Sequence, residues 1–220
     1  DAANLAELAR VDVGDTVYSV AFSSDGTQVV SGHGMRDFSI ERGAIKVWDA
    51  ANLAERASVD VDKDVRSVAF NSDGTMVASA NMCARSALLT ACRSQVKVWE
   101  AGRPDLAGSL TEIASVDLGG FVTSVAFGSK GTKVVSGGDL GIQMWECDTY
   151  LGSLIELASV DGGGDVNSVA FSGDGTKVVS GAIMGAVKVL DAESLTELAS
   201  FDTGSEVTSV AFNGDGTKVV

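Results

Sequence analysis

The chain has 220 residues and is 45% hydrophobic, so it can bury a core and does not have the composition of a disordered protein. A formal net charge of −14 argues against binding to nucleic acid or anionic lipid and suits a basic partner. No apolar run reaches about 18 residues, so we expect no membrane-spanning helix and no direct membrane insertion. Only three cysteines and no Asn-x-Ser/Thr site occur, which favours an intracellular (cytoplasmic or organellar) protein over a secreted one.

Internal repetition dominates the sequence. The stretch "VYSVAFSSDGTQVVSG" begins at Val17, and close copies begin near residues 65, 122, 166 and 207. A second block such as "AIKVWDA" and a third such as "LTEIASVD" follow the first four copies. A period of 41 to 57 residues indicates a repeat architecture in which each unit is one supersecondary element.

Each unit predicts four short strands in chain order. "SVAF" is rich in β-formers, and the "DGT" that follows predicts a tight hairpin turn, because Asp-Gly accepts positive φ. "KVVSG" pairs back, and "IKVWD" alternates again. "ELASVD" has helical propensity, but its constant place between strands favours an outer strand.

Repeated four-stranded antiparallel units predict a β-propeller, because a single unit cannot bury both of its faces alone. We therefore expect an all-β fold in which the inner strands fill the gaps between blades. The residues expected in these gaps are Val20, Phe22, Val68, Phe70, Val125, Phe127, Val169, Phe171, Val210 and Phe212.

The pattern "SVAFSSDGTQVVSG…IKVWDA" resembles the WD-repeat β-propeller family over nearly the whole chain outside the insertions. Two departures stand out. The Gly-His pair that usually precedes the inner strand is absent, and the fourth repeat has Leu190 in place of tryptophan. We therefore expect the family's buried hydrogen-bond network through that histidine to be missing and stability to depend on apolar packing between blades.

The chain begins and ends inside a repeat. Residues 1–12 match Asp49–Asp60, which predicts an outer strand, and Val220 lies two residues before the expected "SG". The count is then five blades, the last incomplete, in a single domain over residues 1–220. We expect this domain to be truncated at both ends and to belong to a larger ring, for example one of seven blades; the alternative is closure by a second copy.

Two insertions interrupt the repeats between the second and third strands, at His33–Ala44 and Asn81–Gln95. The second could form a short helix. Both should emerge on one face of neighbouring blades, where loops on a rigid scaffold commonly bind partners; the alternative is loop drift without function. The candidate contact residues are Arg36, Phe38, Ile40, Arg42, Met82, Arg85, Leu88, Leu89 and Arg93. A third insertion, Gly102–Ser109, should be a rim loop on the opposite face.

The loops that lead into the inner strands are rich in acidic residues and should form an acidic face on the same side as the two long insertions. Its main members are Asp15, Asp62, Asp64, Asp165 and Glu206. Such a face is either simply solvated or attracts a basic segment of a partner.

Other chemistry finds little support in the sequence. "DVDKD" at Asp60–Asp64 spaces carboxylates as calcium loops do but lacks the following glycine and the distal glutamate. Cys83 and Cys92 are expected to be free thiols, and His33 to be an ordinary loop residue. We expect no cofactor, no metal site and no enzyme activity.

The sequence therefore predicts a non-catalytic protein-interaction scaffold or a peripheral subunit of a larger complex, which docks other proteins through the two insertions and the acidic face. One alternative is a regulatory or sensor propeller of a longer multidomain protein. Another is a propeller that binds calcium or a small ligand.

Overall fold

The computed structural model describes residues 7–34, 42–82, 93–101, 108–129 and 131–220, and every regular element in them is a β-strand. The strands form four blades of four antiparallel strands each, in chain order from the inner strand outward. The first blade holds β1 (Thr16–Phe22), β2 (Gln28–Gly34), β3 (Gly43–Asp49) and β4 (Glu55–Val61), and the second β5 (Asp64–Phe70), β6 (Met76–Met82), β7 (Ser94–Glu100) and β9 (Thr111–Leu118). The third holds β10 (Val122–Phe127), β11 (Lys133–Gly138), β12 (Gly141–Asp148) and β13 (Ser153–Val160), and the fourth β14 (Val166–Phe171), β15 (Lys177–Ala182), β16 (Ala186–Asp191) and β17 (Glu197–Asp202).

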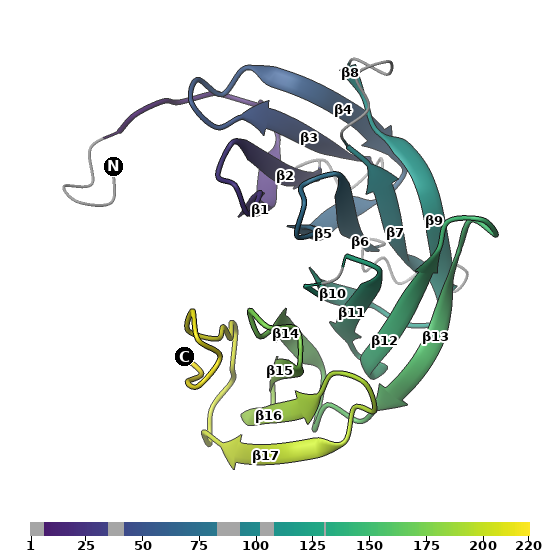
Figure 1. Cartoon of the computed structure of the whole chain (residues 1–220), viewed down its shortest axis with the longest axis vertical. Helices are drawn as coiled ribbons and strands as arrows, with labels where there is room; N and C mark the ends of the chain where they lie inside the picture. The colour runs from purple at the N-terminus through teal and green to yellow at the C-terminus, as the bar shows by residue number, and fades with distance from the viewer. Residues whose placement is uncertain (1–6, 35–41, 83–92, 102–107, 130) are drawn as a thin grey trace.

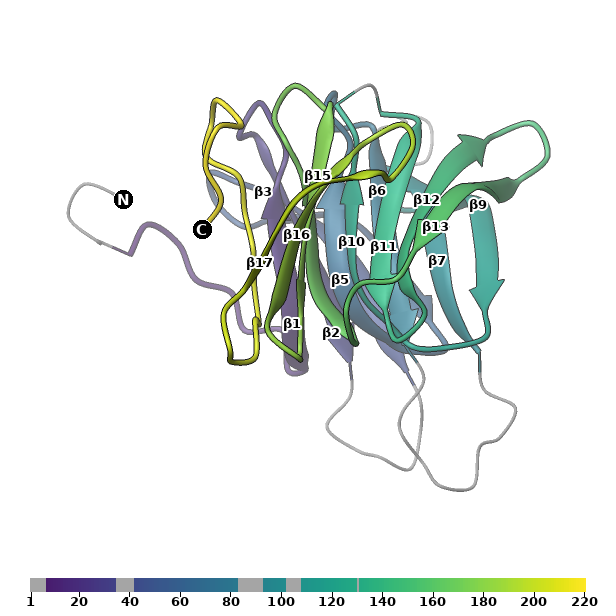
Figure 2. The same ribbon diagram turned by 90° about the horizontal axis from the view of Figure 1, so that it is seen from below.

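The blades are arranged in an arc (Figure 1). The inner strands β1, β5, β10 and β14 line its concave side, and the outer strands β4, β9, β13 and β17 form its convex side. Seen from below, the strands span between two rims of connecting segments (Figure 2). The predicted β-propeller architecture is therefore confirmed, including the outer-strand interpretation of "ELASVD".

The Asp-Gly-Thr motif forms the hairpin between the first two strands of the first, second and fourth blades, and the third blade has Lys130 in the sequence position of the aspartate. In the fourth blade, Asp174 accepts hydrogen bonds from the Ser172 hydroxyl at 2.6 Å and from the Thr176 amide at 3.0 Å. These bonds lower the pKa of Asp174 to about 2. Gly175 has φ of +70°, which glycine adopts without steric cost. The repeated motif thus has a structural role at each turn.

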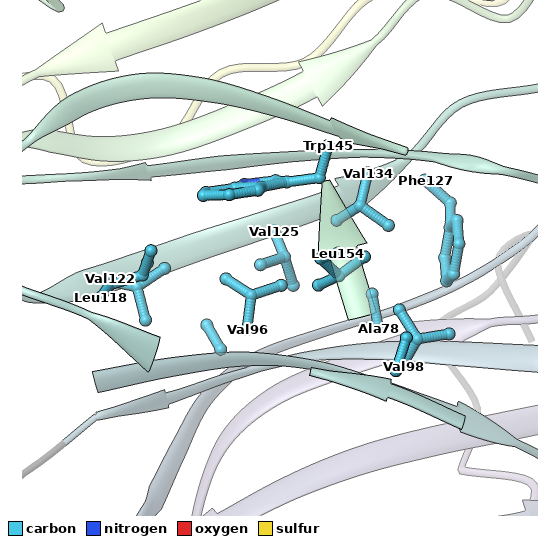
Figure 3. Packing of buried hydrophobic residues seen from close by; sticks show 12 residues of the cluster. Ala78, Val96, Val98, Leu118, Val122, Val125, Phe127, Val134, Trp145 and Leu154 are labelled. Atoms are coloured by element: carbon cyan, nitrogen blue, oxygen red, sulfur yellow. The ribbon is translucent and has the colours of Figure 1, made fainter. Parts of the chain in front are cut away.

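The core lies between neighbouring blades rather than within them. One cluster joins Ala78, Val96 and Val98 of the second blade to Val125 and Trp145 of the third. Figure 3 shows these two sets of side chains facing one another. Equivalent clusters join the first blade to the second and the third to the fourth.

A recurring joint sets the spacing of the blades. The inner-strand serine of each blade accepts a hydrogen bond from an amide of the next inner strand: Val68 to Ser19, Val125 to Ser67, Val169 to Ser124 and Val210 to Ser168, all at 3.0–3.2 Å. Valines of that next strand pack on the second strand of the preceding blade. At Gly137 an added Cβ would lie 2.6 Å from Val166 and 2.8 Å from Val169.

Where a preceding blade exists, the predicted interblade valines and Phe127 are buried, and Phe70, Phe171 and Phe212 are half-buried. Val68, Val125, Val169 and Val210 are 4–7% exposed, and Phe127 is 8% exposed. The prediction is wrong for β1, where Val20 is 65% and Phe22 is 68% exposed, because no blade of the described chain packs against that face.

The predicted strand count also needs correction at both ends. In residues 7–15, where an outer strand was expected, no strand forms, because no third strand of the described chain lies beside them. The fifth repeat forms only a short hairpin with one isolated bridge, between Phe212 and Val219. Within the described residues there are thus four complete blades and one hairpin.

Two short contacts link blades along the convex side. β8 (Gly108–Ser109), the end of the third insertion, pairs in parallel with Ala57 and Ser58 of β4. Ser115 of β9 forms a single parallel bridge with Ser153 of β13. The described end of the predicted rim loop therefore extends the first blade's sheet.

Candidate protein-interaction face

Each of the two long insertions begins later and ends earlier than the sequence suggested. His33 and Gly34 belong to β2 and pair with Ala44 and Gly43 of β3. Asn81 of β6 likewise pairs with Gln95 of β7. The repeat pattern breaks at these positions, but their backbones continue the strand ladders. The first insertion therefore reduces to residues 35–42 and the second to residues 83–93.

The structure places three of the predicted contact residues at the roots of these insertions. Arg42 and Arg93 are exposed, and Met82 is half-buried at the end of β6. The other candidates, Arg36, Phe38, Ile40, Arg85, Leu88 and Leu89, lie outside the described residues, as does the possible helix.

The predicted acidic face carries basic groups at its junction between the first two blades. Asp15, Asp62, Asp165 and Glu206 are exposed. Asp64 is half-buried, and Arg66 lies 3.0 Å from its carboxylate. Burial raises the pKa of Asp64, while Arg66 and a hydrogen bond from Tyr18 oppose that shift.

This junction is tied together across the blades. The Arg66 guanidinium of β5 lies 4.0 Å from the ring centroid of Tyr18 on β1, a cation–π contact. Lys63 is buried, and its ammonium group lies 3.4 Å from the carboxylate of Asp62. Basic groups therefore also lie on this face: Lys63 and Arg66 near the first two blades, and Lys188 beside Asp161 of the fourth.

A buried hydrogen-bond network is present, and it runs through His33 of β2 and not through the family's histidine before the inner strand, which this sequence lacks. Trp48 donates its indole N–H to Ser31 Oγ at 2.7 Å, and Ser31 Oγ lies 2.7 Å from His33 Nε2. His33 is 1% exposed, so it is a core residue of β2 and not a loop histidine. Its place two residues after the serine puts both side chains on one face of the strand, which was the overlooked signal.

The network changes from blade to blade. In the second blade Trp99 donates to Ser79 at 2.8 Å, and Ser79 donates to Asn81 Oδ1 at 2.6 Å. In the third blade Trp145 donates to Ser136 at 2.8 Å. In the fourth blade Leu190 replaces the tryptophan, and the buried Ser180 hydroxyl has no partner among the described residues.

This difference predicts opposite effects of the same substitution. We expect Ser79→Ala to lower the free energy of unfolding by about 1–3 kcal/mol, because it leaves the buried indole N–H of Trp99 unpaired. Ser180→Ala removes a buried hydroxyl that lacks a partner and should leave stability unchanged or increase it. Urea denaturation followed by circular dichroism checks the pair, and equal losses in the two variants would contradict the assigned network.

The described residues form no site arranged for metal binding or thiol chemistry. No group of three or more His, Cys, Asp or Glu side chains there is arranged to hold a metal ion. Asp62 and Asp64 of the calcium-like "DVDKD" segment instead contact Lys63 and Arg66. Cys147 is a free thiol whose pKa is raised, chiefly by burial.

No helix long and apolar enough to cross a membrane occurs among the residues that the structure describes.

Comparison with known proteins agrees with this architecture. The family model "WD domain, G-beta repeat" matches residues 10–49, 58–100, 114–146 and 155–188, which together make up more than half of the chain. A search of the curated proteins finds no match. Repeats of this family generally form scaffolds for protein–protein interaction, and their propellers are typically non-catalytic. From its four matched repeats and its bladed fold, the chain belongs to the WD-repeat family of β-propeller proteins.

Proposed function

We propose that this propeller is a non-catalytic scaffold, or a peripheral subunit of a larger complex, that docks another protein at the corner formed by its two long insertions. The observation that carries the proposal is the position of their roots. Both insertions connect second to third strands, in the adjacent first and second blades, so they leave the same rim of a rigid body. Exposed Arg42 and Arg93 mark the two roots.

The charge of this rim supports a partner with basic segments. Asp15, Asp62, Asp165 and Glu206 are exposed there, and the net charge of the chain is −14. Long-range attraction of this kind speeds association and helps select partners more than it adds affinity. Asp62 and Asp64 of the calcium-like segment contact Lys63 and Arg66, so the interaction function is preferred over calcium binding.

The test replaces Phe38, Arg85 and Leu88 with serine. We expect the melting temperature to stay nearly constant, since the substitutions change no residue of the described blade core, while binding of the natural partner in the native assembly weakens. A triple variant at exposed positions on the opposite rim, Ser24→Ala, Asn52→Ser and Tyr150→Ser, serves as the control. Unfolding of the insertion variant, or equal binding by both variants, would contradict the proposal.

We also propose that residues 1–220 form one propeller domain, with repeats beginning near 17, 65, 122, 166 and 207. Further repeats would cover the face of β1 that carries Val20 and Phe22. The support is the exposure of Val20 and Phe22: the counterparts of Val20 are buried at each interblade joint, and those of Phe22 are buried or half-buried. Cross-linking mass spectrometry on the native assembly tests this. Links from Lys218 to repeat-bearing peptides of the same polypeptide are expected, and links there only to an unrelated protein would contradict it.

A further inference from the structure

One edge of the first blade's outer strand is covered by a short segment of the second repeat. Gly108 and Ser109 of β8 pair in parallel with Ala57 and Ser58 of β4. Ala57 is buried there, and Ser58 is half-buried. This contact ties the first blade to the second on the convex side of the arc (Figure 1).

The next joint repeats this contact. Ser153, the first residue of β13, pairs in parallel with Ser115 of β9, and the Ser115 amide donates to the Gly152 carbonyl at 3.3 Å. The covering segments share their sequence and their place in the repeat, since "GSLTEIASVD" begins at Gly108 and "GSLIELASVD" at Gly152. In both cases a Gly-Ser-Leu segment therefore pairs with the edge of the preceding outer strand.

The fourth repeat lacks the residue that this contact requires. Gly108 and Gly152 have φ of +98° and +66°, which residues with a side chain rarely adopt. Glu193 occupies the same position in the fourth repeat. Its amide instead donates to the Asp191 carboxylate at 3.0 Å, in the turn before β17. The fourth blade therefore leaves the outer strand of the third blade uncovered.

Beyond Ser153, this edge of β13 has no neighbouring strand in the described chain. Ser159 is exposed, whereas Ser115 at the covered edge of β9 is half-buried. Ile155 and Leu157 are each 45% exposed. An open edge with apolar side chains is a ready template for pairing with another chain.

The free edge presents a backbone hydrogen-bond donor at a defined position. Ser159 lies opposite Gln143 of β12. Ser115 lies opposite Lys97 of β7, at the same place in its own blade. Because the Ser115 amide points toward its covering segment, the Ser159 amide points toward the free edge. Glu156 accepts a hydrogen bond from Gln143 at 3.4 Å, so this carboxylate lies over the sheet and not across the edge.

We propose that the free edge of β13, residues 154–160, binds an extended segment of a partner protein by parallel strand addition. The segment carries a glycine and a serine followed by an apolar residue, like the segments that cover β4 and β9. Both Gly-Ser-Leu segments of this chain are already paired, so the occupant comes from another protein. Backbone hydrogen bonds supply affinity in this mode of recognition, and side-chain positions supply specificity. The site lies on the convex side, so it does not rest on the interaction proposed for the insertions.

The test uses the hexapeptide acetyl-Leu-Gly-Ser-Leu-Ile-Glu-amide, which copies residues 151–156. The ¹⁵N-labelled protein is titrated with this peptide, and its backbone amides are followed by ¹H–¹⁵N NMR. We expect saturable shifts centred on Ser159 and none at Ser115, whose edge is covered. A matched peptide with proline in place of glycine cannot adopt positive φ and should produce no saturable shift. Absence of saturation with the first peptide, or an equal response to the second, would overturn the proposal.

Two substitutions at one position separate the backbone from the side chain. Ser159→Pro removes the amide donor and should weaken peptide binding by about fivefold or more, in line with loss of one hydrogen bond. Proline is tolerated on an edge strand where its missing N–H would face solvent, so the blade should stay folded. Ser159→Ala keeps the amide and should leave binding unchanged. Equal losses in the two variants would contradict recognition through the backbone, and if Ser159→Pro does not fold, the comparison of the two peptides still decides.

A dilution series of the protein alone identifies a different occupant. We expect the amide signals of β13 to be independent of protein concentration. If they shift with concentration in step with dimer formation in analytical ultracentrifugation, the edge binds a second copy of the chain, and the proposal of a partner segment is wrong.

Discussion

Replacing Trp145 with alanine is expected to lower the free energy of unfolding by about 3–5 kcal/mol. Its indole is 3% exposed and lies in the cluster that joins the second and third blades (Figure 3). Truncation opens a cavity at this joint, and it also leaves the Ser136 hydroxyl without the indole donor. Urea denaturation monitored by circular dichroism measures the loss.

The fourth blade supplies the control for this prediction. Leu190 occupies the position of Trp145 there and is fully buried, so an aliphatic side chain can fill the site when its neighbours suit it. We therefore expect Trp145→Leu to cost less than Trp145→Ala. A loss below about 1 kcal/mol for the alanine variant would contradict the view that the core lies between blades.

Most of the fold was predictable because its signals are local and repeated. The Gly-Thr turns and the alternating strands recur in all five copies, and the same block order recurs in the first four, so each copy indicates an antiparallel blade. The error at Val20 and Phe22 has a different origin. Their sequence is that of an interblade strand, but burial depends on a neighbouring blade, which local sequence does not report.

The candidate site was predictable only in outline. The break in the repeat located the insertions, yet His33 and Asn81 resemble insertion residues in sequence while they belong to strand ladders in space. The contact of Arg66 with Tyr18 joins two blades 48 residues apart in sequence and could not be seen before the blades were placed side by side.

The joint between blades gives the second large effect. We expect Gly137→Val to lower the free energy of unfolding by about 3 kcal/mol, at the upper end for an overpacked core. Even a Cβ at this position would lie 2.6 Å from Val166 Cγ1 and 2.8 Å from Val169 Cγ1, and valine adds two more methyl groups. The change also forces apart the strands that the Val169–Ser124 hydrogen bond holds together.

Two comparisons show that this effect would come from the joint and not from loss of a glycine. Ala80 occupies the equivalent place in the second blade and is fully buried, so one methyl group fits where the neighbouring valines make room, and Gly137→Ala should fall between wild type and Gly137→Val. Gly119 is exposed and has no atom within 4 Å of an added Cβ, so Gly119→Val should change stability by no more than about 0.5 kcal/mol. If the valine variants at 119 and 137 lost equal stability in urea denaturation, close approach of valines to glycine could not be what spaces the blades. If only the variant at 137 is destabilised, a small residue at this position of the second strand is what allows the following blade to pack closely against it.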